Sequence, residues 1–453
     1  MRLSAFLASF SRMSLSELNK LSHEELLARN IMLEGQVAEL REQLTSIHSS
    51  EVRARRKPLD FSKFTKRRVA LKLLYLGWEY SGLARQELNK STIAEKLIEA
   101  FSKCRMIEES SDIGFAVCGR TDKGVSALSQ VVALTLRSNV HSGVGVIAPE
   151  DTSNLYPEKP EVDYVLVGNK NLPPDIRILA WCPVPFDFNP RRDCISRSYK
   201  YFFPAADLNV ETMRIAASKL IGQHDFRNFC SPQINNGVFN HERIIFDIDI
   251  SDDDDAKTNL RRFCCLNIRG SAFLYHQIRC IASLLIAIGR GLESPNVIDA
   301  LLDVQKMPGK PQYQMAEAEP LLFFEPEFQE MDWQTSLAAQ EDVLRSMQKL
   351  WTKCTIRAQI VGVMLEAVES KFIFYLLIFS SNDSIFAVII LKEMFPDRFQ
   401  NNYFAAISRE ALFSVGPKRK SILERPTDEA LEEKIQKLEA KRPSTHFEDT
   451  IDG

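Results

Sequence analysis

Runs of apolar residues alternate with polar, turn-rich segments from residue 69 onward. The run 69–75 predicts a strand, and the glycine-containing segment 76–82 ends it. Thr92 and Glu95 have the spacing of a capping box and predict a helix that continues to Phe101. Further strands in this first part are expected at 131–136, 164–167 and 178–183.

The same alternation of strands and helices returns after residue 186. Strands are expected at 198–203, 244–250 and 263–268, and helices at 213–221 and 276–288. We therefore predict an α+β fold in which two similar α/β halves, 69–185 and 186–328, share a central, mostly antiparallel sheet with a cleft between them.

Segments of different character flank these two halves. In the segment 1–50, apolar residues recur at seven-residue steps, which predicts a coiled-coil-like helix over 15–47. This helix pairs with a partner or folds back on its own protein, and the pattern leaves both open. We interpret 51–68 as a basic linker and 329–453 as a C-terminal extension, with helices expected at 333–368 and 426–441.

Composition narrows the class of protein. The 453 residues are 45% apolar and 26% charged with a net charge of −3, which excludes a disordered or collagen-like chain. Nine cysteines without a C-x-x-C pair indicate a reducing compartment rather than a disulfide scaffold or a zinc ribbon. Polar residues interrupt the apolar stretch 372–391, so no membrane span is expected.

Eight basic residues and one acid occupy the segment 53–68. Such a patch could attract a phosphate backbone, but charge alone favours a solvated linker or a nuclear-localisation signal. We expect a nuclear and cytoplasmic protein. The first 12 residues, which carry two arginines and no acid, add the expectation of a mitochondrial pool.

Candidate chemistry begins in the segment CGRTDKGVS, residues 118–126. In an extended chain Arg120 and Asp122 project to the same side, which brings a guanidinium beside a carboxylate. Gly119 and Gly124 allow backbone conformations that suit a loop facing a cleft. The same residues also fit an ordinary type I turn.

Arg279 precedes a ten-residue stretch without any charge. A helix that is apolar on nearly every face is buried, and a buried guanidinium needs a partner. Asp122 is one candidate for that partner, and any surface acid at the wet end of the helix is the alternative.

A third cluster lies on the strand expected at 198–203. Arg197, Tyr199 and Tyr201 would share one face, where Arg and Tyr can grip the phosphate and base of an unpaired nucleotide. Tyrosines on strands are also common at the edge of a core. The segment 224–226 (His-Asp-Phe) fits a structural contact better than an acid/base pair. No motif for nucleotide or metal chemistry is present, so neither a metal nor a cofactor is expected.

With these residues in place, the sequence resembles the TruA family of tRNA pseudouridine synthases, and within it the eukaryotic members that act at tRNA positions 38 and 39. The match extends from about residue 57 to residue 324. It rests on the stretches LKLLYLGWEYSGLARQE, FAVCGRTDKGVSALSQVVAL, LPPDIRILAW, SRSYKYFFP, GQHDFRNFC, AFLYHQIRC and QMAEAEPLLF.

The resemblance implies roles for individual residues. Asp122 matches the nucleophile of the family, Arg120 and Arg279 match the arginines that position it, and Tyr199 matches the aromatic residue that packs on the target uracil. Arg120 and Arg197 are further candidates for substrate binding. The resemblance also implies the anticodon arm of tRNA as substrate and a homodimer in which one tRNA spans both subunits. Pro190 departs from the family pattern.

Conversion of uridine to pseudouridine breaks the N1–C1′ bond and rejoins the base through C5. This isomerisation needs an ionised carboxylate and a site that holds the detached uracil, but no cofactor. We expect a neighbouring guanidinium to lower the pKa of Asp122 below about 3.9. Whether Asp122 attacks C6 or C1′, or removes a sugar proton, stays open. The alternatives are a catalytically inactive tRNA-binding scaffold on the same fold and a metal-assisted hydrolase that uses Asp122.

Overall fold

The computed structural model describes residues 59–380 and 420–440. Gaps within the first range lie at 88, 109–111, 150–151, 153–154, 205–207, 233–239 and 253–262. The chain divides into two units, Met1–Asp60 and Phe61–Gly453, and the fold below is that of the second. The helix expected at 15–47 and the residues 381–391 of the apolar stretch lie outside the described residues.

Three of the four strands that the sequence predicts for the N-terminal half are present. A short 3₁₀ turn η1 (Phe61–Lys63) precedes β1 (Lys66–Tyr75), which begins three residues before the expected position. Helix α4 (Ile93–Lys103) starts at Thr92, whose side chain accepts a hydrogen bond from the backbone N–H of Glu95 as the capping spacing predicts. The remaining strands are β2 (Ala116–Val117), β3 (Ser126–Arg137), β4 (Val146–Ile147) and β5 (Ile176–Pro183).

The prediction of a strand at 164–167 is wrong, because these residues form the short helix α5 (Tyr164–Asn169). Asp163 caps this helix, since its Oδ1 accepts a hydrogen bond of 2.9 Å from the N–H of Leu166. Tyr164 and Val165 are buried in the N-terminal core. Capping and burial on one face therefore outweigh the preference of Tyr and Val for strands.

The C-terminal half repeats the mixture of strands and helices. All five elements that the sequence predicts for it are present, with ends that differ by a few residues. In chain order the half contains β6 (Ser196–Pro204), α6 (Val210–Ser218), β7 (Gly222–Asp225), the 3₁₀ turn η2 (Arg227–Phe229), β8 (Glu242–Asp252), β9 (Phe263–Gly270), α7 (Gln277–Gly289), α8 (Asn296–Leu302) and β10 (Leu321–Glu327).

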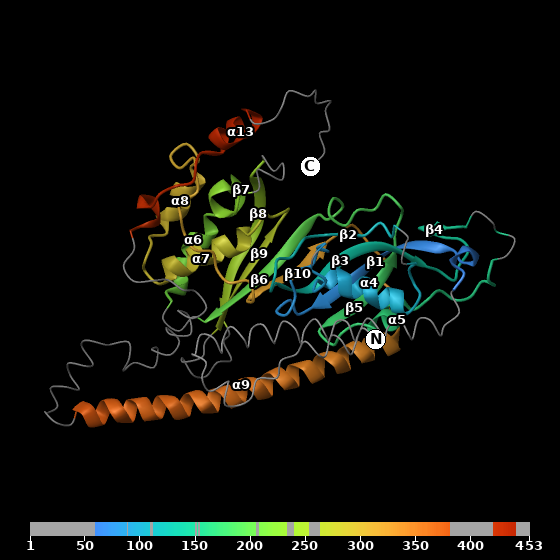
Figure 1. Ribbon diagram of the computed structural model, residues 1–453. Coiled ribbons are helices and arrows are strands. Elements are labelled where there is room, and N and C mark those ends of the chain that lie inside the picture. The colour runs from blue at the N-terminus through green and yellow to red at the C-terminus, as the bar shows by residue number, and fades with distance from the viewer. Residues whose placement is uncertain are drawn as a thin grey trace, which may run out of the picture. The chain divides into compact units, whose positions relative to one another are not determined.

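One sheet runs through both halves, in the order β4-β1-β3-β10-β6-β9-β8-β7 (Figure 1). β10 lies at the junction and pairs with β3 in parallel and with β6 in antiparallel orientation, whereas the other pairings of the described strands are antiparallel. Strand β10 was not among the predicted elements. Because Leu322 pairs with Ser126 and Phe323 pairs with Tyr199, this strand brings the beginning of β3 beside the middle of β6.

Two hydrophobic cores meet at this junction. One core lies among α4, α5 and the strands β1, β3 and β5, and the other lies among α6, α7, α8 and the strands β6, β8 and β9. Tyr199 packs against both. Helix α7 is buried along most of its length, which confirms the expectation from its uncharged sequence.

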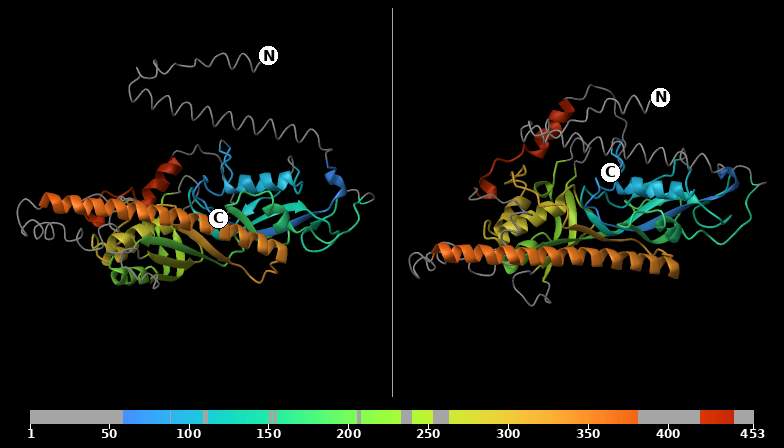
Figure 2. Two further views of the ribbon diagram at one scale, coloured as in Figure 1. Left: turned by 90° about the horizontal axis from the view of Figure 1, so that it is seen from below. Right: turned by 60° about the horizontal axis from the view of Figure 1, so that its bottom comes forward.

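The described residues of the C-terminal extension contain two α-helices, at the places where the sequence predicts them. Helix α9 (Leu337–Ser380) begins beside α5 and β5, where the side chain of Arg177 donates to Ser346 at 3.2 Å, and runs along one side of the unit (Figure 2). The described part of the chain contains no helix with the length and apolar character of a membrane span.

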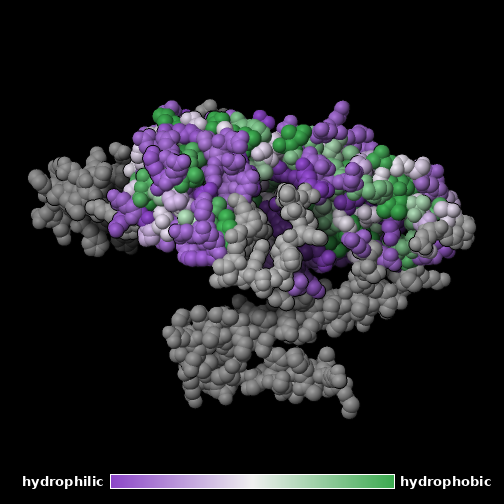
Figure 3. Space-filling model, turned by 90° about the horizontal axis from the view of Figure 1, so that it is seen from above, coloured by the Kyte–Doolittle hydropathy of each residue, from purple (hydrophilic) through white to green (hydrophobic). Residues whose placement is uncertain are grey.

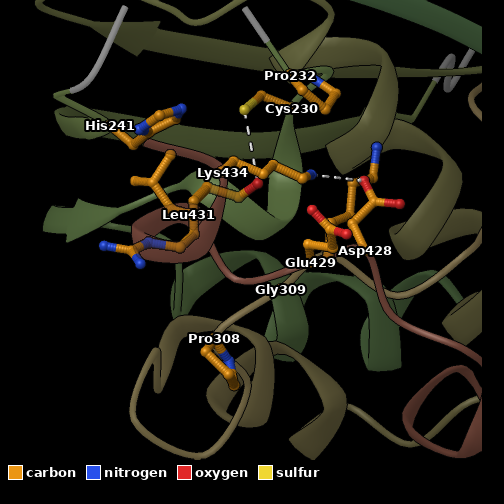
Figure 4. Close-up of a pocket in the computed structure, with 11 residues that line it drawn as sticks. Cys230, Pro232, His241, Pro308, Gly309, Asp428, Glu429, Leu431 and Lys434 are labelled. Carbon is orange, nitrogen blue, oxygen red and sulfur yellow. Dashed lines mark hydrogen bonds and ion pairs between the residues drawn. The ribbon is translucent and has the colours of Figure 1, made fainter. Parts of the chain in front are cut away.

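The later part of the extension folds back onto the C-terminal half. It contains the 3₁₀ turn η5 (Ile422–Glu424) and α13 (Leu431–Ala440). The N–H of Asp428 donates to the carbonyl of Lys310 at 2.8 Å, and Glu432 forms an ion pair of 2.7 Å with Arg227. Figure 4 shows the small pocket between this tail and the segment that carries Cys230.

Candidate active site

The loop between β2 and β3 presents Asp122. The side chain of Gln130, on β3, bonds to both backbone groups of Gly119 at 3.3 and 2.8 Å and so fixes the entry of the loop. At its exit the N–H of Val125 donates to the carbonyl of Asp122 at 3.2 Å, and Gly124 has a φ of +85° that favours glycine. The loop thus faces the cleft and contains a turn, but this turn spans residues 122–125 with Gly124 at a positive φ, and it is not the type I turn that the sequence also fitted.

Asp122 faces the first turn of α7. Its Oδ2 lies 3.7 Å from an Nη of Arg279 and 3.3 Å from Nε2 of His276. The Asp122 side chain is 24% exposed and that of Arg279 is 11% exposed. The pairing of Asp122 with Arg279 is thus present, and Arg279 is fixed further by the bond from its Nε to the carbonyl of Ala316 at 2.8 Å.

The expected pKa of Asp122 is wrong in direction. Burial raises the pKa of this carboxyl above its ordinary value of 3.8, and the charge and hydrogen bond of Arg279 offset only part of that effect. The sequence indicates that a guanidinium lies near Asp122, but it does not indicate how deeply the carboxyl group is buried. In its ionised form, a carboxylate with a raised pKa is a stronger base and nucleophile than a free aspartate.

Tyr199 stands on β6 at the wall of the same cleft. Its ring makes edge-to-face contacts with Phe273 and Phe323, with centroid distances of 5.2 and 5.1 Å. Burial raises the pKa of its hydroxyl, so the side chain is neutral. Tyr201 is fully buried and donates to the carbonyl of Glu317 at 3.0 Å, which assigns it to the core.

A phosphate-binding arginine needs N–H groups that are free to reach the substrate, and those of Arg197 are used within the protein. Its guanidinium is buried and donates to three backbone carbonyls, those of Ser271 at 2.7 Å, Cys118 at 3.3 Å and Arg191 at 2.7 Å. It therefore ties together three segments around the cleft. Its predicted role in substrate binding stays a prediction, and the contacts support a structural role.

Arg120 lies on the cleft wall with an exposed side chain. Within the described ranges, the ion-pair partners of Asp122 are His276 and Arg279, so the expected pairing of Arg120 with Asp122 is absent from this arrangement. The turn at residues 122–125 breaks the extended geometry on which that expectation rested. An exposed guanidinium at this place is available to a substrate.

The cleft itself has a volume of ≈930 Å³ and lies between the two halves. Asp122 is the only acid among the described residues that line it. Figure 3 views the molecule from above and shows a hollow whose visible walls are largely hydrophilic. The cationic lining residues are Arg120, Lys123, Arg191, Arg197, Arg243 and Arg279. Such a surface attracts a polyanion.

Two other candidates from the sequence take structural roles. Arg67 forms an ion pair of 2.9 Å with Glu161, and Arg68 is buried with its guanidinium on the carbonyl of Gly114. The basic segment 53–68 therefore loses both residues as free phosphate ligands, and its residues 53–58 lie outside the described part. Asp225 pairs with Arg227 at 2.7 Å, which confirms a structural reading of 224–226.

His276 is a site residue that the prediction omitted. It lies in the quoted stretch AFLYHQIRC, three residues before Arg279, and this i, i+3 spacing at a helix start was the signal that could have found it. In the part of the chain that the structure describes, no three His, Cys, Asp or Glu side chains gather in a way that could hold a metal ion.

Together, the shared sheet, the buried carboxylate held by a cation and the basic cleft are the features of an enzyme that acts on a polyanionic substrate. A family model described as tRNA pseudouridine synthase matches residues 216–329. The protein of Bos taurus curated as tRNA pseudouridine(38/39) synthase is 38% identical over 79% of this chain and 77% of its own length. The proteins of that name from Mus musculus and Saccharomyces cerevisiae are both 40% identical, over 77% and 61% of this chain and 75% and 61% of their own.

The chain belongs to the TruA family of tRNA pseudouridine synthases, which are isomerases.

Proposed function

We propose that this protein isomerises uridine to pseudouridine at positions 38 and 39 of the tRNA anticodon arm, with Asp122 as the nucleophile and without a cofactor. One observation carries the proposal: Asp122 lies in the basic cleft, against Arg279 and within the same lining as Tyr199. The names of the mammalian and yeast relatives support the two positions.

The chemistry matches this set of side chains. The N1–C1′ bond breaks, a C5–C1′ bond forms, C5 loses a proton and N1 gains one, so atoms and electrons balance within the nucleoside. Asp122 supplies the carboxylate, and Arg279 keeps it charged and oriented. Whether its oxygen bonds to C6 or C1′, or removes a sugar proton, the reaction begins from the ionised carboxylate.

A nucleotide in a stem must leave its helix to reach this carboxylate. Unstacking costs a few kcal/mol. Stacking on an aromatic side chain recovers about 1–3 kcal/mol per base. Tyr199 is held edge-to-face by Phe273 and Phe323, so it offers the detached uracil a surface that is already ordered. The exposed cations Arg120 and Arg191 lie where they can contact the backbone phosphates of the displaced strand.

The direct test uses purified protein and unmodified tRNA transcripts. Transcripts with uridine at position 38 or 39 are compared with transcripts in which cytidine replaces it, and pseudouridine is mapped by carbodiimide adducts and primer extension. We expect adducts at 38 and 39 only, and the same yield in EDTA. A pseudouridine yield that EDTA abolishes would contradict the cofactor-free reaction. tRNA binding without any adduct would support the inactive scaffold.

We also propose that the protein acts as a homodimer. Helix α9 supports this proposal because large apolar side chains are exposed along it, Leu344, Trp351 and Val363 among them, and a second copy can cover them. Light scattering after gel filtration should give the mass of a dimer for the wild type. Trp351→Glu should shift the mass toward the monomer, whereas Lys349→Glu, at a nearby exposed position of the same helix, should not.

The compartment follows as a further proposal, namely the nucleus and the cytoplasm with a mitochondrial pool that depends on residues 1–12. A fluorescent fusion with and without those residues tests it. Mitochondrial signal that survives their deletion would contradict the assignment of the pool.

A further inference from the structure

A tight turn places His276 directly before α7. The N–H of Leu274 donates to Oε1 of Gln277 at 2.7 Å, and the N–H of Gln277 donates back to the carbonyl of Leu274 at 3.1 Å. Within this turn His276 has a φ of +64°, a left-handed conformation that residues with a side chain adopt rarely. Backbone strain of this kind often marks a residue whose side chain has a task.

His276 occupies the N-cap of α7 without capping it. N-cap residues are usually Ser, Thr, Asp or Asn, whose side chains bond to the first N–H groups of the helix. The imidazole makes no such bond and turns both of its nitrogens elsewhere. Nε2 lies 3.3 Å from Oδ2 of Asp122, and Nδ1 lies 2.8 Å from Oγ of Ser231.

These two contacts determine the tautomer while Asp122 is ionised. A carboxylate accepts hydrogen bonds only, so Nε2 must carry the proton that faces it. Nδ1 is then an acceptor, and the hydroxyl of Ser231 donates to it. Ser231 is thus hydrogen-bonded to His276, and the N–H at Nε2 faces the carboxylate of Asp122 across a contact of 3.3 Å.

Ser231 belongs to a well-anchored segment. Its N–H donates to the carbonyl of Tyr275 at 3.0 Å, which holds it beside the turn. Upstream, Arg227 is fixed by Asp225 and by Glu432 of α13, both at 2.7 Å. Figure 4 shows the pocket between this segment and the C-terminal tail. The serine thus has a fixed position from which to orient the imidazole.

We propose that His276, oriented by Ser231, is a positioning residue that donates a hydrogen bond from Nε2 to the carboxylate of Asp122 and holds it, together with Arg279, in its reactive orientation. This inference rests on the proposed function. His276 acts through Asp122 and is not assigned any contact with the nucleoside.

The groups around the imidazole favour its neutral form. It is packed against the ring of Tyr275, with a centroid distance of 3.5 Å. Two positive charges also act on it, those of Arg279 on α7 and of Lys310 in the loop between α8 and β10. Burial and these two cations lower the pKa of His276 to about 4. Asp122 is the acid that faces it, and its charge is shared with Arg279.

The first test removes the ring and keeps the backbone conformation. Glycine adopts a positive φ without strain, so His276→Gly takes away only the imidazole. We expect kcat for pseudouridine formation to fall about 10- to 100-fold, the loss expected for a hydrogen bond to a charged group, while KM stays within about threefold. Arg105→Gly is the matched control, because Arg105 has a φ of +56° outside the site, and it should retain wild-type kcat.

Two further variants separate positioning from folding. His276→Asn also suits a left-handed backbone, but its amide ends near the place of Nδ1 and cannot reach Asp122, so it should lose as much activity as glycine. Ser231→Ala leaves the imidazole in place with an unfixed tautomer and should lose less. Free imidazole should restore part of the activity of His276→Gly.

The pH profile gives the readout that a structural role would not move. A donor to the carboxylate stabilises its ionised form, so its removal should shift the acid limb of kcat/KM to higher pH. The inference is overturned if His276→Gly and His276→Asn fold and keep wild-type kcat, or if kcat falls but the acid limb stays in place. A wild-type protein without any activity would instead refute the proposed function itself.

Discussion

Two largely buried arginines line the cleft, Arg197 and Arg279, and their guanidinium groups have different partners. At the start of β6, Arg197 donates to three backbone carbonyls. At the start of α7, Arg279 donates to one carbonyl and faces the carboxylate of Asp122. Because Arg197 donates to backbone carbonyls, it stabilises the shape of the cleft. Arg279 pairs with a partly buried carboxylate and therefore changes the pKa of that carboxylate.

The largest difference should appear on removal of the guanidinium that faces the acid. Arg279→Ala leaves Asp122 without its cation, so its pKa should rise further and the rate at neutral pH should fall about 100- to 1,000-fold, the loss expected when a charge-stabilising group is removed. Single-turnover rates on an anticodon stem-loop measure this. Arg279→Lys keeps the charge and should lose less. Equal rates for Arg279→Ala and the wild type would show that the cation has no role in the reaction.

The main effect of Arg197→Ala should be a loss of folding stability. Three backbone carbonyls around the cleft lose their donor, and the free energy of unfolding should fall by about 2–4 kcal/mol. Urea unfolding measures this, with the exposed neighbour Arg192→Ala as control. The slope of log tRNA affinity against log salt should stay unchanged for Arg197→Ala. A slope smaller by about one would mean that Arg197 neutralises a phosphate after all.

A smaller effect is expected in the pH dependence of stability. The folded-state pKa of His276 is about 4, below its ordinary value of 6.5. Between these values the unfolded chain binds more protons than the folded one, so this group makes stability rise with pH across that window. Urea unfolding from pH 4.5 to 7 should show a shallower rise for His276→Gly than for the wild type. An unchanged slope would place the imidazole in open solvent.

Much of the fold could be predicted because strand and helix periods are local properties. The helix at Thr92 and the buried α7 are two examples. β10 was missed because its importance comes from its two neighbours, β3 and β6, which no local pattern reveals.

The site could be predicted only in part, because local motifs identify residues but not their neighbours in space. Asp122, Arg279 and Tyr199 came from motifs and do line one cleft. The raised pKa of Asp122 depends on burial, and the role of Arg197 depends on carbonyls from distant segments. Neither can be obtained from the spacing of residues along the chain.

The central claim is that the ionised carboxylate of Asp122 performs the isomerisation, and Asp122→Asn tests it most directly. Its amide keeps the shape but cannot act as a nucleophile, so single-turnover pseudouridine formation should fall at least about 1,000-fold. The affinity for tRNA should stay within about threefold. The unfolding free energy at pH 7 should not fall, because the folded-state pKa of Asp122 is raised and the charged form is the costly one. Asp187→Asn, at an exposed carboxylate, is the control. Turnover by Asp122→Asn within tenfold of the wild type would contradict the account.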